Sequence, residues 1–129
     1  MVRRLVIGAA GQLGIELVLR MQSEFGAASV DISDIRVPDN ESVMQSKFLH
    51  LDATDEGAMS KILEEGQYDE VYHLAAMLSA TGEKKPLAAW DLNMQSLLNI
   101  LEAAKDGWIK RVFWPSSIAV FGPRTPKNN

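Results

Sequence analysis

Three evenly spaced glycines after the first apolar run constrain the fold of this chain more than any other feature. The short run 2–7 is followed by Gly8, Gly11 and Gly14, and an amphipathic segment begins within this turn. At a junction of strand and helix, the first glycine permits a tight turn, the second leaves room for a pyrophosphate, and the third lets the helix pack closely on the strand. Unpaired N–H groups at the helix start attract an anion. The G-x-x-G-x-x-G spacing alone also fits an ordinary strand–helix turn.

The rest of the chain alternates between strand-like and helix-like patterns. Strands are expected at about 2–8, 29–34, 47–51, 70–74 and 110–114, and helices at about 12–25, 56–65 and 86–105. Such alternation favours a parallel sheet covered on both faces, and right-handed crossovers give the strand order 3-2-1-4-5. We therefore predict an α/β chain with a Rossmann-type doubly wound parallel sheet that stops after strand five. Residues 1–129 are expected to form one domain.

Periodicity also predicts which side chains face the core. The first helix should bury Leu13, Leu17, Val18, Met21 and Phe25, and the long helix should bury Leu87, Trp90, Met94, Leu97, Leu98, Leu101 and Ala104. The second strand alternates in polarity, which indicates that one of its faces is less covered. Thr54 or Asp55 is expected to cap the helix at 56–65, and Gly107 to end the long helix.

Composition excludes several classes of function. The 129 residues carry a net charge of −4, 47% are hydrophobic, and there is no cysteine and only two histidines. We therefore expect no disulfide, no metal site, no nucleic-acid binding and no membrane binding. The basic start of the chain resembles a signal peptide, but the apolar run behind it is short and broken by glycine. We interpret it as a strand and predict a cytoplasmic protein.

An acidic residue at the end of the second strand supports a dinucleotide site. Asp34 stands 20 residues after Gly14, where a carboxylate can accept hydrogen bonds from both hydroxyls of an adenosine ribose. The same charge would repel the 2′-phosphate of NADP. Arg36 could instead bind that phosphate, but we expect the carboxylate to decide, so the predicted cofactor is NAD. The alternative is a solvated aspartate in a turn.

Three further strand ends carry candidate residues. After the third strand, Asp52 can accept from the adenine amino group and the backbone of Ala53 can bond a ring nitrogen, although an aspartate leading a helix is an equal alternative. After the fourth, small residues at 74–76 leave room for the cofactor, and His73 is expected to fill space rather than act as a base. After the fifth, the hydroxyls at 116–117 could bond a substrate oxygen, as could any loop serine.

Together these motifs resemble the extended short-chain dehydrogenase/reductase superfamily of NAD-dependent epimerases and dehydratases. The resemblance rests on residues 8–14, 34–36, 51–55, 73–76, 93 and 116–122. Within this superfamily, stretches 75–84, 89–94 and 113–123 are most similar to the short-chain type of L-threonine 3-dehydrogenase. UDP-galactose 4-epimerase and sugar dehydratases share the general motifs but fit these three stretches less well.

The resemblance implies a function and a set of site residues. L-Threonine would be oxidised to L-2-amino-3-oxobutanoate by hydride transfer to NAD, with Ser117 as the catalytic residue that holds the substrate hydroxyl and Ser79 near the substrate. The full-length enzyme would be a homodimer. The expected cofactor-binding residues are Gly8, Gly11, Gln12, Leu13, Gly14, Asp34, Ile35, Arg36, Asp52, Ala53, Leu74, Ala75, Ala76 and Asn93.

One part of the family pattern is missing. The general base of the family is the tyrosine of a Tyr-x-x-x-Lys motif. Here Tyr68 is followed four residues later by Tyr72, and Tyr72 by Ala76. We therefore expect the amino-terminal portion of a longer enzyme, inactive by itself. The alternatives are a fragment of a nucleotide-sugar epimerase or dehydratase, and a non-catalytic dinucleotide-binding module.

Overall fold

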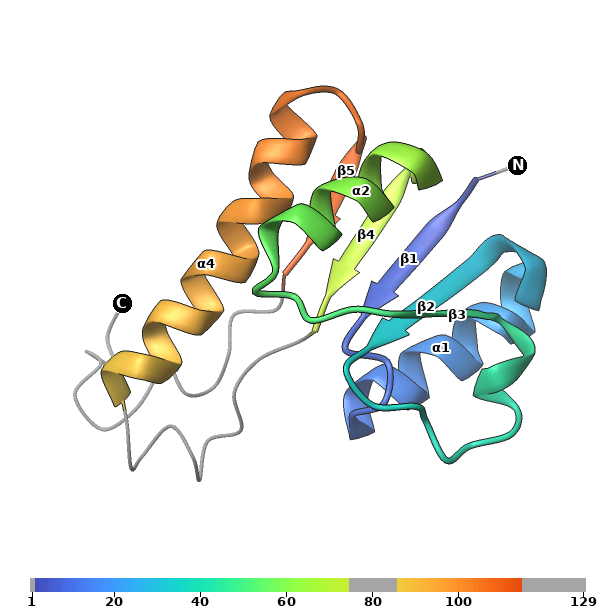
Figure 1. Ribbon diagram of the computed structural model, residues 1–129. Coiled ribbons are helices and arrows are strands. Elements are labelled where there is room, and N and C mark those ends of the chain that lie inside the picture. The colour runs from blue at the N-terminus through green and yellow to red at the C-terminus, as the bar shows by residue number, and fades with distance from the viewer. Residues whose placement is uncertain (1, 75–85, 115–129) are drawn as a thin grey trace, which may run out of the picture.

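A five-stranded parallel sheet forms the centre of the computed structural model, which describes residues 2–74 and 86–114 (Figure 1). The strand order is β3-β2-β1-β4-β5, as the alternating pattern predicted, and every neighbouring pair is parallel. The strands are β1 (Arg4–Ile7), β2 (Val30–Asp34), β3 (Lys47–His50), β4 (Glu70–His73) and β5 (Arg111–Phe113).

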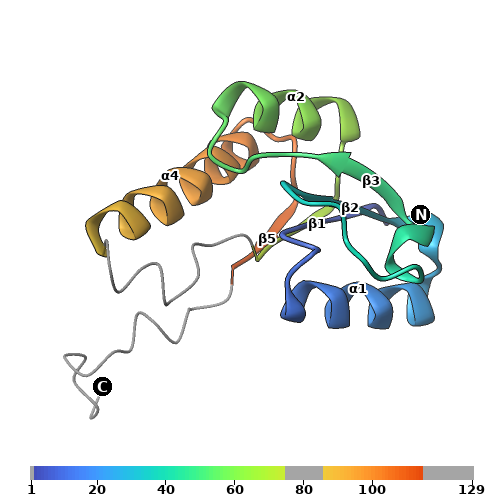
Figure 2. The ribbon, with the colours of Figure 1, turned by 60° about the horizontal axis from the view of Figure 1, so that its bottom comes forward.

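Helices cover both faces of this sheet. Figure 2 shows α1 on one face and α2 and α4 on the other. The chain runs from β1 to β3 in one direction across the sheet and from β4 to β5 in the other, so right-handed crossovers place their helices on opposite faces. The helices are α1 (Gln12–Phe25), α2 (Glu56–Gly66) and α4 (Pro86–Lys105), with short 3-10 turns η1 (Ala27–Ser29) and η2 (Val43–Gln45).

Each face of the sheet has its own apolar core, because successive side chains of a strand point to opposite faces. In β1, Leu5 and Ile7 enter the core under α2 and α4, whereas Val6 enters the core under α1. Burying a side chain of this size contributes roughly 1.5–3 kcal/mol. The first core also contains Leu51, Met59, Leu63, Tyr68, Val71, Ile100 and Ile109, and the second contains Val18, Met21, Val30, Ile32 and Val43.

Some large apolar side chains that periodicity placed inside are exposed. Leu13 and Phe25, at the two ends of α1, are 58% and 49% exposed, and Leu98 and Leu101 of α4 are also exposed. Phe25 is covered in part by the guanidinium group of Arg4, which lies 3.8 Å from the ring centroid. The inward side of α4 carries Ser96, Leu97, Asn99, Ile100 and Ala103. Of the predicted stripe, Leu97 is buried and Met94 and Ala104 are half-buried, whereas Leu98 and Leu101 are exposed because the buried, hydrogen-bonded Ser96 and Asn99 face inward instead. The side chains of Leu87 and Trp90 lie outside the described residues.

The second strand is buried on both faces, which also corrects the prediction from its polar alternation. Residues Val30 to Ser33 are all buried. Asp31 Oδ2 accepts hydrogen bonds from the Tyr68 hydroxyl at 2.6 Å and from Arg3 Nη2 at 3.3 Å. Ser33 Oγ is likewise satisfied inside the sheet. Burial, with the neighbouring Asp31 carboxylate, raises the pKa of Tyr68. The polar side chains of Asp31 and Ser33 are therefore buried with hydrogen-bond partners, and do not face solvent as the alternating pattern predicted.

Local sequence signals mark the start of α2 and the end of α4 where they were expected. Of the two candidate caps for α2, Asp55 is the one whose carboxylate accepts from an N–H of the first turn, that of Ala58 at 3.0 Å. At the end of α4, Gly107 has a φ of +85°, and its N–H donates to the Ala104 carbonyl at 3.1 Å. The N–H of Trp108 donates to the Ala103 carbonyl at 3.0 Å, which completes a Schellman motif.

A buried histidine joins the end of β4 to α4. His73 is 1% exposed, and its Nε2 lies 2.9 Å from Ser96 Oγ. The Ser96 hydroxyl donates to the carbonyl of Asn93, so the histidine Nε2–H is the donor in this pair. His73 Nδ1 is then a bare acceptor, and it has no partner among the described residues. Burial lowers the pKa of His73 to about 4.

This depressed pKa predicts a loss of stability in mild acid. Above the ordinary histidine pKa of about 6.5, neither the folded nor the unfolded state is protonated. As the pH falls from there to about 4, the unfolded chain binds a proton that the folded chain refuses. The free energy of unfolding should fall by about 3 kcal/mol more in the wild type than in His73→Gln, measured by urea denaturation at each pH. Parallel pH curves for the two proteins would contradict this.

Candidate dinucleotide site

The glycine turn joins β1 to α1 in a conformation that requires its first glycine. Gly8 has a φ of +91°, a region that favours glycine. The N–H groups of Gly8 and Ala9 both donate to the carbonyl of Ser33, at 2.9 and 3.0 Å. The turn is therefore hydrogen-bonded to the end of β2 before α1 begins. Gly11 is the N-cap residue of α1, so no side chain caps the first turn of this helix.

The third glycine allows close contact between α1 and the turn. A Cβ at Gly14 would collide with the carbonyl oxygen of Gly8 and lie 2.8 Å from the Cα of Ala9. A Cβ at Gly11 would meet only the Gly8 oxygen, at an ordinary 3.6 Å. The packing role predicted for Gly14 thus has a steric basis. The protein packing does not require glycine at position 11, and its predicted role toward a phosphate stays a prediction.

The first turn of α1 offers hydrogen-bond donors. Within the described residues, the N–H groups of Gln12, Leu13 and Gly14 form no hydrogen bond, and the first turn contains no acidic residue. A helix start with unpaired N–H groups carries roughly half a positive charge. The turn therefore suits a phosphate group, and the predicted residues meet the chemical requirement for a pyrophosphate.

Asp34 lies directly beside this turn. Its Oδ2 accepts from the N–H of Ala10 at 2.9 Å, and its Oδ1 accepts from the N–H of Arg36 at 3.0 Å. Each oxygen retains acceptor capacity for a ribose hydroxyl. Arg36 and Ile35 are exposed, and the Arg36 guanidinium forms no ion pair within the part of the chain that is described. The bond to Ala10 is a second role for Asp34 that sequence reasoning missed.

The turn after β3 meets the same edge of the sheet. The N–H of Leu51 donates to the carbonyl of Asp34 at 3.1 Å. Beyond it, Asp52 Oδ1 accepts from the Thr54 hydroxyl at 2.7 Å and from its N–H at 3.0 Å, and these bonds lower the pKa of Asp52. Asp52 is exposed and Ala53 is 9% exposed. The structure thus brings the predicted phosphate, ribose and adenine residues to adjacent strand ends.

The remaining predicted residues are only partly described. Leu74 follows β4, and its N–H donates to the Ile7 carbonyl at 2.8 Å, which places it beside the glycine turn. Asn93 lies on α4 and is half-buried. Ala75, Ala76, Ser79 and Ser117 lie outside the described residues.

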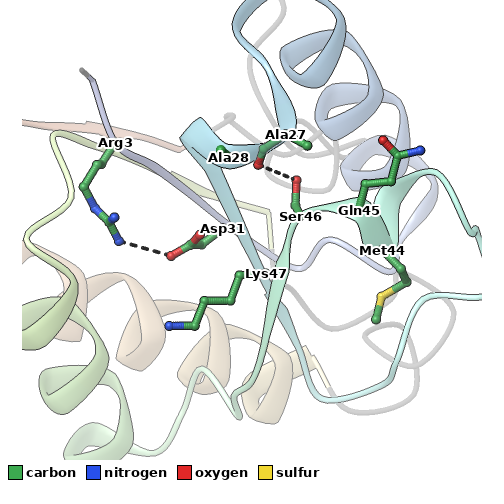
Figure 3. A pocket seen from close by; sticks show the side chains of 8 residues that line it. All are labelled: Arg3, Ala27, Ala28, Asp31, Met44, Gln45, Ser46 and Lys47. Carbon is green, nitrogen blue, oxygen red and sulfur yellow. Dashed lines mark hydrogen bonds and ion pairs between the residues drawn. The ribbon is translucent and has the colours of Figure 1, made fainter.

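A hollow of about 560 Å³ lies at the other end of the strands (Figure 3). Figure 3 shows Arg3 reaching toward Asp31, and Ser46 donating to the carbonyl of Ala27 at 3.1 Å. The hollow lies at the amino ends of β1, β2 and β3, so it is separate from the predicted dinucleotide site at their carboxyl ends. Its other lining residues are Ala28, Met44, Gln45 and Lys47.

No group of three or more His, Cys, Asp or Glu in residues 2–74 and 86–114 could hold a metal ion. None of the helices in these ranges is both long and apolar enough to cross a membrane.

A parallel sheet in the order 3-2-1-4-5, with a glycine turn and a helix start at the end of its first strand, defines a Rossmann-type dinucleotide-binding fold. The particular family follows from a family model that matches residues 4–129. The chain belongs to the NAD dependent epimerase/dehydratase family.

Solved structures and curated relatives agree with this family. An L-threonine dehydrogenase from Cupriavidus necator, in its holo form, is 46% identical over 96% of this chain, with a TM-score of 0.84. An L-threonine dehydrogenase from Clostridium difficile is 42% identical over 98% of this chain, with a TM-score of 0.85. A UDP-glucose-4-epimerase from Stenotrophomonas maltophila with bound NAD is 25% identical over 100% of this chain, with a TM-score of 0.79.

The chain spans about 40% of the length of these proteins. It covers 40% of the C. necator and C. difficile structures and 41% of the S. maltophila structure. An uncharacterised epimerase/dehydratase of Staphylococcus saprophyticus is 45% identical over 97% of this chain, which covers 39% of that relative.

The steric role of Gly14 predicts a large effect of a single methyl group. Gly14→Ala would push α1 away from the turn, because the clash is with backbone atoms that cannot rotate aside. We expect it to lower the free energy of unfolding by about 3 kcal/mol or more, measured by urea denaturation. Gly57→Ala is the matched control. Its Cβ meets only the Asp55 carboxylate at 3.7 Å, so it should stabilise α2 by up to about 1 kcal/mol. Equal stability of the two variants would refute the packing role.

Proposed function

We propose that this chain is the NAD-binding portion of an L-threonine 3-dehydrogenase, an NAD-dependent oxidoreductase. The observation that supports it is the difference in identity between two kinds of neighbour with the same fold. The L-threonine dehydrogenases from C. necator and C. difficile are 46% and 42% identical to the chain. The S. maltophila epimerase and a nucleoside-diphosphate-sugar epimerase from Agrobacterium tumefaciens are 25% and 26% identical.

Three successive strand ends would each contact one part of NAD. The free N–H groups at 12–14 would hold the pyrophosphate, and the Asp34 carboxylate would accept from the adenosine ribose hydroxyls. The turn at 52–53 would contact the adenine. Hydrogen bonds to a charged group contribute about 1.5–3 kcal/mol each, so Asp34 would contribute substantially to cofactor affinity. Its negative charge would disfavour the 2′-phosphate of NADP, even with Arg36 nearby.

The chemistry would be the oxidation of L-threonine at its β-carbon to L-2-amino-3-oxobutanoate. Bound NAD would supply the hydride acceptor for this carbon, while a base would take the proton of the hydroxyl as the carbon–oxygen double bond forms. Ser117 would hold the hydroxyl oxygen, and Ser79 would contact the amino acid. In the family that the chain resembles, the base belongs to a Tyr-x-x-x-Lys motif, which these 129 residues do not contain. The chain by itself should therefore be inactive.

A nucleotide-sugar epimerase is the second candidate. The S. maltophila epimerase holds NAD and matches 100% of this chain, so the same glycine turn and carboxylate would serve either reaction. Under this alternative, the two candidates would differ in their substrate contacts. We further propose, from the resemblance alone, that the whole protein is a cytoplasmic homodimer.

Removing the Asp34 carboxylate tests the assignment of the cofactor. Asp34→Ala deletes the acceptor for the ribose hydroxyls and the bond to Ala10, so NAD affinity should fall by about tenfold to a hundredfold. NADP affinity should fall less, because a repulsive charge is removed at the same time. Calorimetric titration with both cofactors measures the ratio. The control is Asp39→Ala, an exposed carboxylate in the following loop. An unchanged NAD/NADP ratio in Asp34→Ala would remove Asp34 from the site.

Two chimeras test the substrate. Residues 1–129 would replace the corresponding portion of the C. necator L-threonine dehydrogenase, and separately that of the S. maltophila UDP-glucose-4-epimerase. We expect the first chimera to reduce NAD with L-threonine and the second to lack activity on its UDP-sugar, because Ser79 and Ser117 come from this chain. The 129-residue chain alone should form no NADH. Activity of the second chimera on its UDP-sugar, with no activity of the first on L-threonine, would favour the epimerase. Formation of NADH by the 129-residue chain alone would refute its predicted inactivity.

A further inference from the structure

A buried amide on α4 reaches the turn that follows β3. Asn99 is 7% exposed, and its Nδ2 donates to the carbonyl of Ala53 at 3.4 Å across 46 residues of sequence. Its Oδ1 accepts from Gln95 Nε2 at 2.9 Å, one turn earlier on the same helix. Gln95 is exposed, so the pair links the surface of α4 to the interior. Asn99 is therefore held in one orientation, with its NH₂ group directed at the turn.

This bond completes the restraint of one peptide group. The peptide between Ala53 and Thr54 is held at both ends, because Asn99 binds its carbonyl and Asp52 Oδ1 accepts its N–H at 3.0 Å. The preceding peptide is held at its carbonyl, which accepts from the N–H of Asp55 at 2.9 Å. Three of the four polar groups of these two peptides are thus occupied by protein partners.

The fourth group and one carboxylate oxygen stay available. Within the described residues, neither the N–H of Ala53 nor Oδ2 of Asp52 takes part in a hydrogen bond. The turn therefore presents one donor next to one acceptor. The Watson–Crick edge of adenine has the complementary pair, an acceptor at N1 and a donor at the 6-amino group. Hypoxanthine, with a donor at N1 and an acceptor at O6, has the opposite pair.

We propose that Asn99 is a positioning residue that sets the base specificity of the dinucleotide site. By holding the Ala53 carbonyl, it keeps the adjacent N–H and the Asp52 carboxylate in the arrangement that accepts adenine and rejects hypoxanthine. The inference rests on the proposed function, since it concerns the adenine end of the NAD site. Asn99 itself touches the turn and not the base.

The test compares NAD with nicotinamide hypoxanthine dinucleotide, which differs only in the base edge. Affinities are measured by calorimetric titration of the wild type and of Asn99→Leu, which has a similar volume but no donor. The wild type should prefer NAD, and Asn99→Leu should reduce that preference about tenfold while its affinity for the hypoxanthine analogue is unchanged. Asn99→Ser, which is too short to reach Ala53, provides a second variant if the leucine disrupts folding, and should give the same reduction.

Ser96→Ala is the matched control. Ser96 is also a buried polar residue of α4, but it is bonded to His73 and not to the turn. It should leave the base preference unchanged even if it lowers stability. The positioning role would be overturned if both Asn99 variants kept the base preference of the wild type, or if they lost affinity for the two dinucleotides equally. A wild type that binds neither dinucleotide would instead overturn the proposed function.

Discussion

The close approach of α1 to the end of β1 is the constraint on which the candidate site depends. It is possible only because position 14 lacks a Cβ, and because Gly8 adopts a positive φ that turns the chain directly into the helix. The same contact directs the first N–H groups of α1 toward the carboxyl edge of the sheet. The carbonyl of Ser33 accepts from two N–H groups of this turn, so the turn is joined to β2 as well as to β1 and α1.

The other parts of the site are attached to this unit through hydrogen bonds between strand ends. Asp34 binds the turn through its side chain and binds Leu51 through its carbonyl. The segment after β3 is in turn held by Asn99 from α4. A chain of short contacts therefore runs from the glycine turn to the predicted adenine-binding turn. A ligand that bridges these turns would meet groups that are already oriented, which lowers the entropy cost of binding.

Right-handed crossovers between alternating strands and helices predicted the strand order, and apolar periodicity located α1 and α4. It did not predict Asp31, Ser96 and Asn99 as interior residues. Each is buried because a partner distant in sequence satisfies it, and polarity patterns carry no information about such partners. The burial predicted for Leu13 and Phe25 was wrong because these residues lie at the two ends of α1 and not in its middle, where Val18 and Met21 meet the core. Of the site, the glycine turn and Asp34 were predictable from spacing, whereas the bond from Asn99 was not.

The two edges of the sheet differ in how their polar groups are satisfied. At the amino edge, Arg3 and Asp31 are paired with each other and with Tyr68. At the carboxyl edge, the N–H groups of residues 12–14 and of Ala53 have no partner within the described residues. Leaving donors unpaired costs stability unless water or a ligand satisfies them. This asymmetry, more than the presence of a hollow, supports the proposal that the dinucleotide binds at the carboxyl edge of the sheet.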